Sequence, residues 1–169
     1  MPEPRDRPLF ILDQNFPQPI LREAFKRYVP EVRMQPLWDF EPRLTRHHED
    51  WQVILGLAQK GAEGFISCDD NMLDNPRVVA VIEQTKLTVV SCQATGHDAI
   101  VASGLLLAHL PRIGKRHDPD RPQVWRLKPT EERPRKLGDL KDAIERKSGL
   151  RVDDFRLTRE VLQEPLLPP

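Results

Sequence analysis

Three short apolar runs constrain the fold of this chain more than any other feature of its sequence. They lie at residues 9–12, 64–68 and 87–91. A run of four or five residues without polar alternation is typical of a strand that is buried on both faces of a parallel sheet. Each run is followed by apolar residues at helical spacing. This alternation predicts an α/β protein with a parallel sheet covered by helices.

Weaker patterns complete the expected order. Two further strands are predicted near residues 32–34 and 123–127, and helices at 20–28, 50–60, 76–82, 98–110, 136–147 and 154–162. Residues 36–48 and 111–122 are expected to be a loop and a linker. The predicted architecture is a three-layer sandwich with a central, mostly parallel sheet of about 4–5 strands. Residues 1–128 are expected to form this domain, and residues 129–169 a C-terminal helical extension.

Composition limits the class of protein. The chain has 169 residues, of which 38% are hydrophobic and 31% charged, and it has no run of about 18 apolar residues that could cross a membrane. The N-terminus has no apolar signal region, and two cysteines, Cys68 and Cys92, fit a reducing compartment. We therefore expect a soluble cytoplasmic protein.

Acidic residues follow two of the predicted strands and begin one helix. Asp13 follows the first strand, Asp50 opens the helix at 50–60, and the third strand is followed by Asp69, Asp70 and Asn71. The carboxyl ends of parallel strands meet at one edge of a sheet, so these carboxylates are expected to lie close together and repel one another. Mg²⁺ or Mn²⁺ would relieve that repulsion and could activate a water for phosphodiester hydrolysis. For any single cluster, capping of a helix or turn is the competing interpretation.

The same segments carry a family resemblance. Residues 10–17 read Phe-Ile-Leu-Asp-Gln-Asn-Phe-Pro, which resembles the opening of PIN-like proteins whose first strand ends Leu-Asp-Glu-Asn-Leu-Pro. The resemblance extends over roughly residues 9–110, through the helix at Asp50 and the segment at 64–72. It implies a PIN-like fold and a metal-dependent ribonuclease, a hydrolase that is often the toxin of a toxin–antitoxin pair. It also implies that Asp13, Asp50 and Asp69 are the catalytic, metal-binding carboxylates, with Asn71 at the position of a fourth acid and Asp70 as a near-equivalent ligand.

Two departures from the family pattern leave alternatives open. Gln14 stands where the family has Glu, and Asn71 where it has Asp, so the site carries less negative charge. One alternative is a catalytically degenerate PIN-like module that binds RNA or a protein partner. Another is a receiver-like phosphoacceptor domain, which expects a second acid where Gln14 stands and a lysine after the last strand, where Lys128 is a loose match. The resemblance also leaves open an antitoxin protein as partner and a homodimer.

Basic residues concentrate in the second half of the chain. Residues 1–110 carry 11 Lys and Arg against 15 Asp and Glu, whereas residues 111–169 carry 15 against 11. Cationic side chains can follow an RNA backbone without reading its sequence, although a solvated surface gives the same count. The residues predicted to contact RNA are Asn15, His48, Arg112, Lys115 and Arg116.

Overall fold

Five parallel strands form the centre of the molecule. The computed structural model describes residues 7–14, 16, 18–46, 49–69, 71–95, 98–129 and 137–155. The strands are β1 (Leu9–Leu12), β2 (Arg33–Pro36), β3 (Gly64–Ser67), β4 (Thr88–Cys92) and β5 (Gln123–Leu127), and they lie in the order β2-β1-β3-β4-β5. Every neighbouring pair is parallel. The predicted α/β class and the parallel sheet are therefore confirmed.

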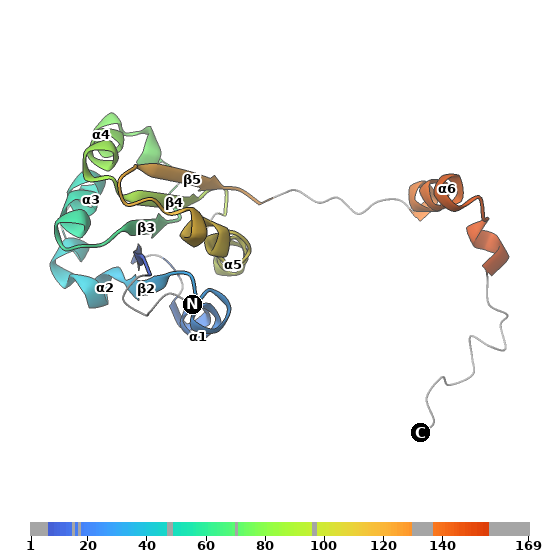
Figure 1. The fold of residues 1–169 in the computed structure, drawn as a ribbon, viewed down its shortest axis with the longest axis horizontal. Coiled ribbons are helices and arrows are strands. Elements are labelled where there is room, and N and C mark those ends of the chain that lie inside the picture. The colour runs from blue at the N-terminus through green and yellow to red at the C-terminus, as the bar shows by residue number, and fades with distance from the viewer. Residues whose placement is uncertain are drawn as a thin grey trace, which may run out of the picture. The chain divides into compact units, whose positions relative to one another are not determined.

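The central strands are buried on both faces, as their apolar runs predict. On β1, Phe10 and Leu12 belong to one core and Ile11 to the other, because successive side chains point to opposite faces of a strand. The first core lies under α1 (Gln18–Tyr28) and α5 (Ala99–Arg116), and the second under α3 (Asp50–Gln59) and α4 (Pro76–Thr85). Figure 1 shows these two helix pairs on opposite sides of the sheet. The result is a three-layer α/β sandwich.

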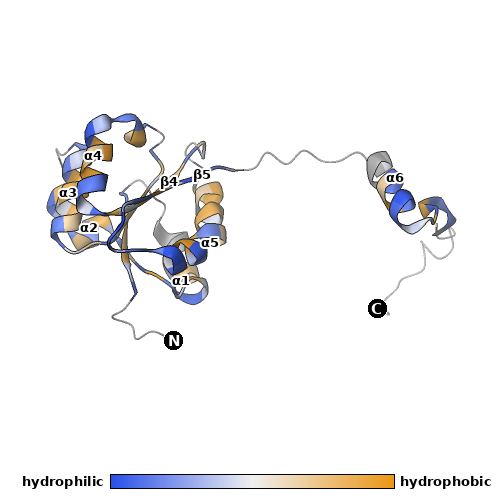
Figure 2. Cartoon of the chain, turned by 45° about the horizontal axis from the view of Figure 1, so that its top comes forward, coloured by the Kyte–Doolittle hydropathy of each residue, from blue (hydrophilic) through white to orange (hydrophobic). Residues whose placement is uncertain are grey.

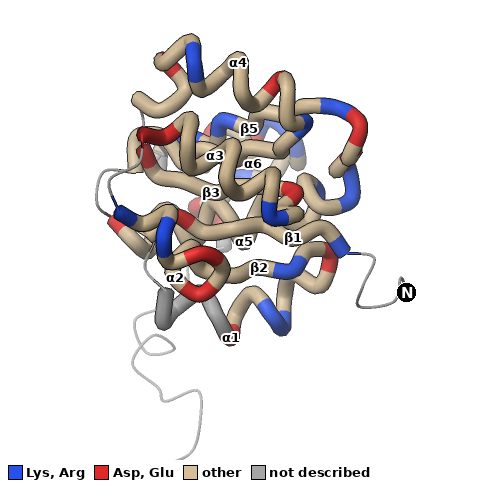
Figure 3. The backbone as a smooth tube through the Cα atoms, turned by 90° about the vertical axis from the view of Figure 1, so that its left-hand side faces the viewer, with Lys and Arg blue, Asp and Glu red and all other residues tan. Residues whose placement is uncertain are grey.

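Charge and hydropathy follow the same layers. In Figure 2 the apolar parts of α3, α4 and α5 face the sheet, and in Figure 3 the strands β1 and β3 carry no charged residue. Charged side chains lie on the helices, on the segments that connect them to the sheet, and on the outer strands β2 and β5, which carry Arg33 and Arg126. No helix within the described ranges is both long enough and apolar enough to cross a membrane.

Two connections differ from the prediction. Within the expected loop at 36–48 the chain forms α2 (Leu37–Phe40) and the 3-10 helix η1 (Pro42–Thr45), and Leu37 is buried in the second core. The expected linker at 111–122 was wrong as well, because α5 continues through Pro111 to Arg116. An interior proline disfavours a helix by about 3 kcal/mol. Here Ile113, fully buried in the first core, offsets that penalty through packing that no local pattern reveals.

Helix starts agree with the capping residues in the sequence. The Asn75 side chain accepts a hydrogen bond from the Arg77 amide at 3.0 Å, directly before α4. Asp98 accepts hydrogen bonds from the amides of Ile100 and Val101, at 2.9 and 3.0 Å, at the start of α5. A further 3-10 helix, η2 (Met72–Asp74), joins β3 to α4.

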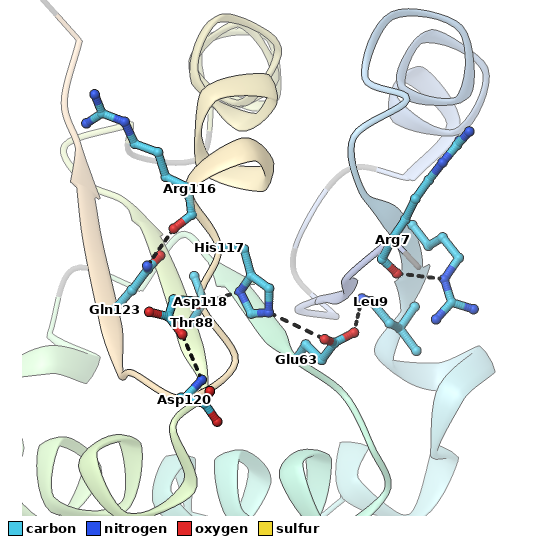
Figure 4. A network of polar contacts seen from close by, with 10 residues as sticks. Arg7, Leu9, Glu63, Thr88, Arg116, His117, Asp118, Asp120 and Gln123 are labelled. Carbon is cyan, nitrogen blue, oxygen red and sulfur yellow. Dashed lines mark hydrogen bonds and ion pairs between the residues drawn. The ribbon is translucent and has the colours of Figure 1, made fainter. Parts of the chain in front are cut away.

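A polar network closes the edge at which the strands begin, called the amino edge below (Figure 4). The hydroxyl oxygen of Thr88, the first residue of β4, lies 3.1 Å from His117 Nδ1. His117 Nε2 lies 3.4 Å from Glu63 Oε1. The other oxygen of Glu63 accepts a hydrogen bond from the Leu9 amide at 3.0 Å. The network thus ties the residue after α5 to the first residues of β1 and β4.

The chain divides into two compact units, Met1–Pro129 and Thr130–Pro169. In the second unit, α6 (Leu137–Ser148) is followed by the 3-10 helix η3 (Val152–Phe155). Gly149, with a φ of 72°, ends α6 in the left-handed conformation that glycine adopts without strain. Lys141 pairs with Asp153, and the Val152 amide donates to Glu145 at 3.1 Å. The expected helix at 154–162 lies mostly outside the described residues.

The close contact between β1 and β3 gives the first prediction. Gly64 lies opposite Phe10, and a Cβ at residue 64 would come within 2.4 Å of the fully buried Phe10 ring. We expect Gly64→Ala to lower the free energy of unfolding by about 1–3 kcal/mol, as overpacking of a core does. Urea denaturation followed by circular dichroism measures it.

The matched control is Gly104→Ala on α5, where an added Cβ meets no atom within 4 Å. That substitution should raise the free energy of unfolding by roughly 0.5–1 kcal/mol, because alanine favours a helix interior over glycine. Equal effects of the two substitutions would contradict the described packing of β1 against β3.

Candidate functional site

Two of the predicted carboxylates lie where the order of the strands reverses. Asp13 directly follows β1, and Asp69 lies two residues beyond the end of β3, which is the neighbour of β1. In open parallel sheets, ligands bind outside the carboxyl ends of the strands at such a switch point. The edge at which β1, β3 and β4 end is called the carboxyl edge below. The fold thus places Asp13 and Asp69 at the position where a ligand site is expected.

Ser67, the last residue of β3, connects these two acids. Its hydroxyl donates a hydrogen bond to Asp13 Oδ2 at 3.0 Å and accepts one from the Asp69 amide at 3.1 Å. Asp69 Oδ1 in turn accepts a hydrogen bond from the Asn71 amide at 2.8 Å. The Asp13 carboxylate also accepts a hydrogen bond from the Gln14 backbone amide. Backbone and hydroxyl donors of the protein therefore fix both carboxylates.

Asp50 joins the pair from a separate element. It occupies the first turn of α3, where the helix dipole favours a negative charge. Burial, chiefly, raises the pKa of Asp50, and the charges of Asp69 and Glu49 raise it further. Burial also raises the pKa of Asp13, the hydrogen bond from Ser67 opposes this shift, and the charges of Asp50 and Asp69 add to it. Three elements thus bring three mutually repelling carboxylates within range of one another.

The donor set fits a hard divalent cation. Among the residues that the structure describes, no basic side chain forms an ion pair with Asp13, Asp50 or Asp69. Ser91 on β4 lies opposite Ser67. Its hydroxyl is buried and has no hydrogen-bond partner among the described residues. Magnesium commonly binds through one or two carboxylates and several waters. Carboxylates without a basic partner among the described residues suit that mode.

The described side chains do not form a closed metal cage. No group of three or more His, Cys, Asp and Glu side chains within the described ranges is gathered tightly enough to hold an ion. Asp70, the acid that follows Asp69, lies outside those ranges, as do Asn15 and His48. Asn71 is exposed, and its backbone amide contacts the site through Asp69. Direct coordination by Asn71 stays a prediction.

The predicted basic residues lie elsewhere. The carbonyl of Arg116 accepts a hydrogen bond from the Gln123 side chain at 2.7 Å at the amino edge, where Figure 4 shows both residues. Lys115 pairs with Glu31 at 3.4 Å just before β2, and the Arg112 guanidinium lies 5.5 Å from the centre of the Trp125 ring. Strands of four residues span roughly 13 Å. The structure therefore does not bring these three residues to the carboxylates, and their contact with RNA stays a prediction for a separate surface.

Two residues at the carboxyl edge were not singled out from the sequence. Ser67 reads as an ordinary strand residue, and only the pairing of β1 with β3 places it against Asp13. Arg77 reads as a solvated residue of α4, yet its side chain lies beside Glu49 and Trp51 at the start of α3. The packing of α3 against α4, which sequence spacing does not encode, creates this contact.

Comparison of the chain with family models, curated proteins and solved structures found no match.

The raised pKa of Asp13 gives the second prediction. At a pH above its pKa in the folded protein, the ionised Asp13 carboxylate destabilises the folded state. This effect disappears at a pH below the ordinary carboxyl pKa of 3.8. Asp13→Asn keeps an acceptor for the Ser67 hydroxyl and removes the charge. We therefore expect a higher melting temperature than wild type at pH 8 in EDTA, and a difference that shrinks as the pH approaches 3.8.

Asp120→Asn serves as the control, because Asp120 is exposed in the turn before β5. Its melting temperature should follow that of wild type throughout the pH range. A lower melting temperature for Asp13→Asn at pH 8 would show that Asp13 is a stabilising residue and would argue against electrostatic repulsion at this edge.

Proposed function

We propose that this protein is a divalent-metal-dependent ribonuclease of the PIN-like type, which hydrolyses RNA phosphodiester bonds. The observation that carries the proposal is the convergence of Asp13, Asp50 and Asp69, from three elements, at the switch point of the sheet without a basic partner among the described residues. Such an arrangement raises the free energy of the unliganded protein. A bound divalent cation would relieve this repulsion.

The chain's own residues have separable roles in this proposal. Asp13 and Asp69 would hold Mg²⁺ or Mn²⁺, with Asp50 adding negative charge beside them. The ion, when bound, supplies a more acidic water and stabilises charge that develops on the phosphate. Ser67 fixes the carboxylate of Asp13 and the backbone of Asp69, and the Asn71 amide fixes the Asp69 carboxylate.

Cleavage of RNA tests the proposal directly and is the third prediction. Wild type should cleave a mixed-sequence, single-stranded RNA with Mn²⁺ or Mg²⁺, and EDTA should stop the reaction. Asp13→Asn/Asp69→Asn should lose at least about 100-fold in rate, because a metal site contributes several kcal/mol to the transition state. Asp120→Asn, at the amino edge, should retain the rate of wild type.

Manganese binding, followed by isothermal titration calorimetry, distinguishes the two ways in which cleavage can fail. A folded wild type that binds Mn²⁺ and RNA but does not cut would indicate the degenerate PIN-like module that Gln14 and Asn71 favour. A folded wild type that neither cuts RNA nor binds Mn²⁺ would rule out the nuclease.

A second function is favoured by the strand order. The arrangement 2-1-3-4-5 is the doubly wound order that a receiver-like phosphoacceptor domain requires, and Lys128 directly follows β5. The exposed Gln14, where this alternative expects an acid, speaks against it. Incubation with acetyl phosphate and Mg²⁺ should leave the mass of the protein unchanged if the nuclease proposal is right. A gain of one phosphoryl group that Asp69→Asn abolishes would favour the phosphoacceptor.

A further inference from the structure

Arg77 lies at the carboxyl edge, where two residues at the start of the neighbouring helix α3 hold its side chain. Its guanidinium lies 5.4 Å from the centre of the Trp51 ring, and its Nη1 lies 3.8 Å from Glu49 Oε2. The Trp51 indole N–H donates to the same Glu49 oxygen at 2.6 Å. Glu49 and Trp51 flank Asp50 in sequence. The Arg77 side chain therefore lies against the start of α3, the helix that carries Asp50, although Arg77 belongs to α4.

The position of Arg77 on its own helix is unfavourable for a cation. It lies in the first turn of α4, where the helix dipole presents partial positive charge. Stacking on Trp51 and the charge of Glu49 offset this repulsion. Together they hold a positive charge at a helix start, which is where anions such as phosphate bind in proteins.

The hydrogen-bond donors of Arg77 remain available. Arg43 shows the contrasting case, since it donates two hydrogen bonds to Glu41, at 2.7 and 2.6 Å, and these hold the pKa of Glu41 down at about 2. The Arg77 guanidinium makes no hydrogen bond to a described residue, and 65% of the Arg77 side chain is exposed. Arg43 therefore stabilises the fold, whereas Arg77 is fixed in place with its planar set of donors free.

We propose that Arg77, positioned by Trp51 and Glu49, is a phosphate-binding subsite for single-stranded RNA beside the carboxylate site. This inference rests on the proposed nuclease function and names the residue that holds its substrate. Three carboxylates repel the phosphates of an approaching strand, so a neighbouring cation is needed to retain the phosphate next to the scissile one. A guanidinium can bind that phosphate through two parallel hydrogen bonds.

Trp51 and Glu49 act on the strand through Arg77 and are positioning residues. Stacking restricts the rotamers of the Arg77 side chain, so less conformational entropy is lost when a phosphate binds. Glu49 attracts the guanidinium without saturating its donors. The alternative is that Arg77 only links α3 to α4, in which case its removal would change stability and leave the salt dependence of RNA binding unaltered.

The test, and the fourth prediction, measures binding and cleavage separately. Binding of a fluorescein-labelled, single-stranded RNA is followed by anisotropy in Mg²⁺, in the Asp13→Asn/Asp69→Asn background so that no cleavage occurs. Adding Arg77→Ala should raise Kd about tenfold, the loss expected for a charge-assisted contact to phosphate. It should also reduce the slope of log K against log salt by about 0.7, the value for one phosphate contact on a single strand. Arg77→Lys should restore the slope and part of the affinity.

Arg27→Ala is the matched control. Arg27 also stacks on an aromatic ring, at 5.6 Å from the centre of Tyr28, but it lies at the end of α1, at the amino edge. Its removal should leave Kd and the salt slope unchanged. Arg77→Gln, which retains a side chain as far as Cδ and removes the charge, replaces the alanine variant if that variant loses its helical circular dichroism signal.

Kinetics in the wild-type background complete the design. Arg77→Ala should raise KM for the RNA several-fold with kcat nearly unchanged, because the subsite contacts a phosphate that does not react. Equal Kd and salt slope for Arg77→Ala and Arg27→Ala would overturn the subsite, as would absence of RNA binding by the parent protein. If no variant cleaves RNA but Arg77→Ala still weakens binding with a smaller slope, the nuclease proposal fails and the phosphate subsite stands.

Discussion

Burial of β1, β3 and β4 on both faces is the constraint on which the rest of this structure depends. Strands without a polar face need a layer of helices on each side, and parallel pairing with helical crossovers supplies both layers. A parallel sheet also gathers the ends of all its strands at one edge. Polar residues that follow the apolar runs are therefore forced together. The chemistry of the site is in this sense a consequence of how the core is built.

The carboxylates at the carboxyl edge reduce the stability that this core provides. Burial raises the pKa of Asp13, and the neighbouring charges of Asp50 and Asp69 raise it further. Ser67 offsets part of this penalty by donating to Asp13, yet the same hydroxyl also fixes the Asp69 amide. Ser67 thus links the Asp13 carboxylate to the backbone that carries Asp69.

Local sequence patterns predicted the elements whose stability is local or fully buried. β1 and β5 have the predicted bounds, and Asn75 and Asp98 cap the helices they precede. The extent of α5 could not be predicted, because Pro111 argues for an end and only burial of Ile113 against the sheet outweighs it. Likewise, Asp13 and Asp69 could be predicted to converge from the strand rule alone. Ser67 could not, since its role depends on the register of β1 against β3.

The placement of basic residues shows how the fold separates the basic segment of the chain from the carboxylates. α5 runs back along the sheet, so its last turn lies at the amino edge. The basic residues at 112–116 are therefore at that edge. A helix that begins at the carboxyl edge must end at the opposite one. Arg77 instead contacts the start of α3, next to Asp50 in sequence, from the first turn of α4 in the acidic half of the chain, where a single arginine changes the count little. In a doubly wound fold, the ends of strands and the starts of helices lie at the carboxyl edge, so the position of a charge within its helix has to be considered before the charge is assigned to a ligand there.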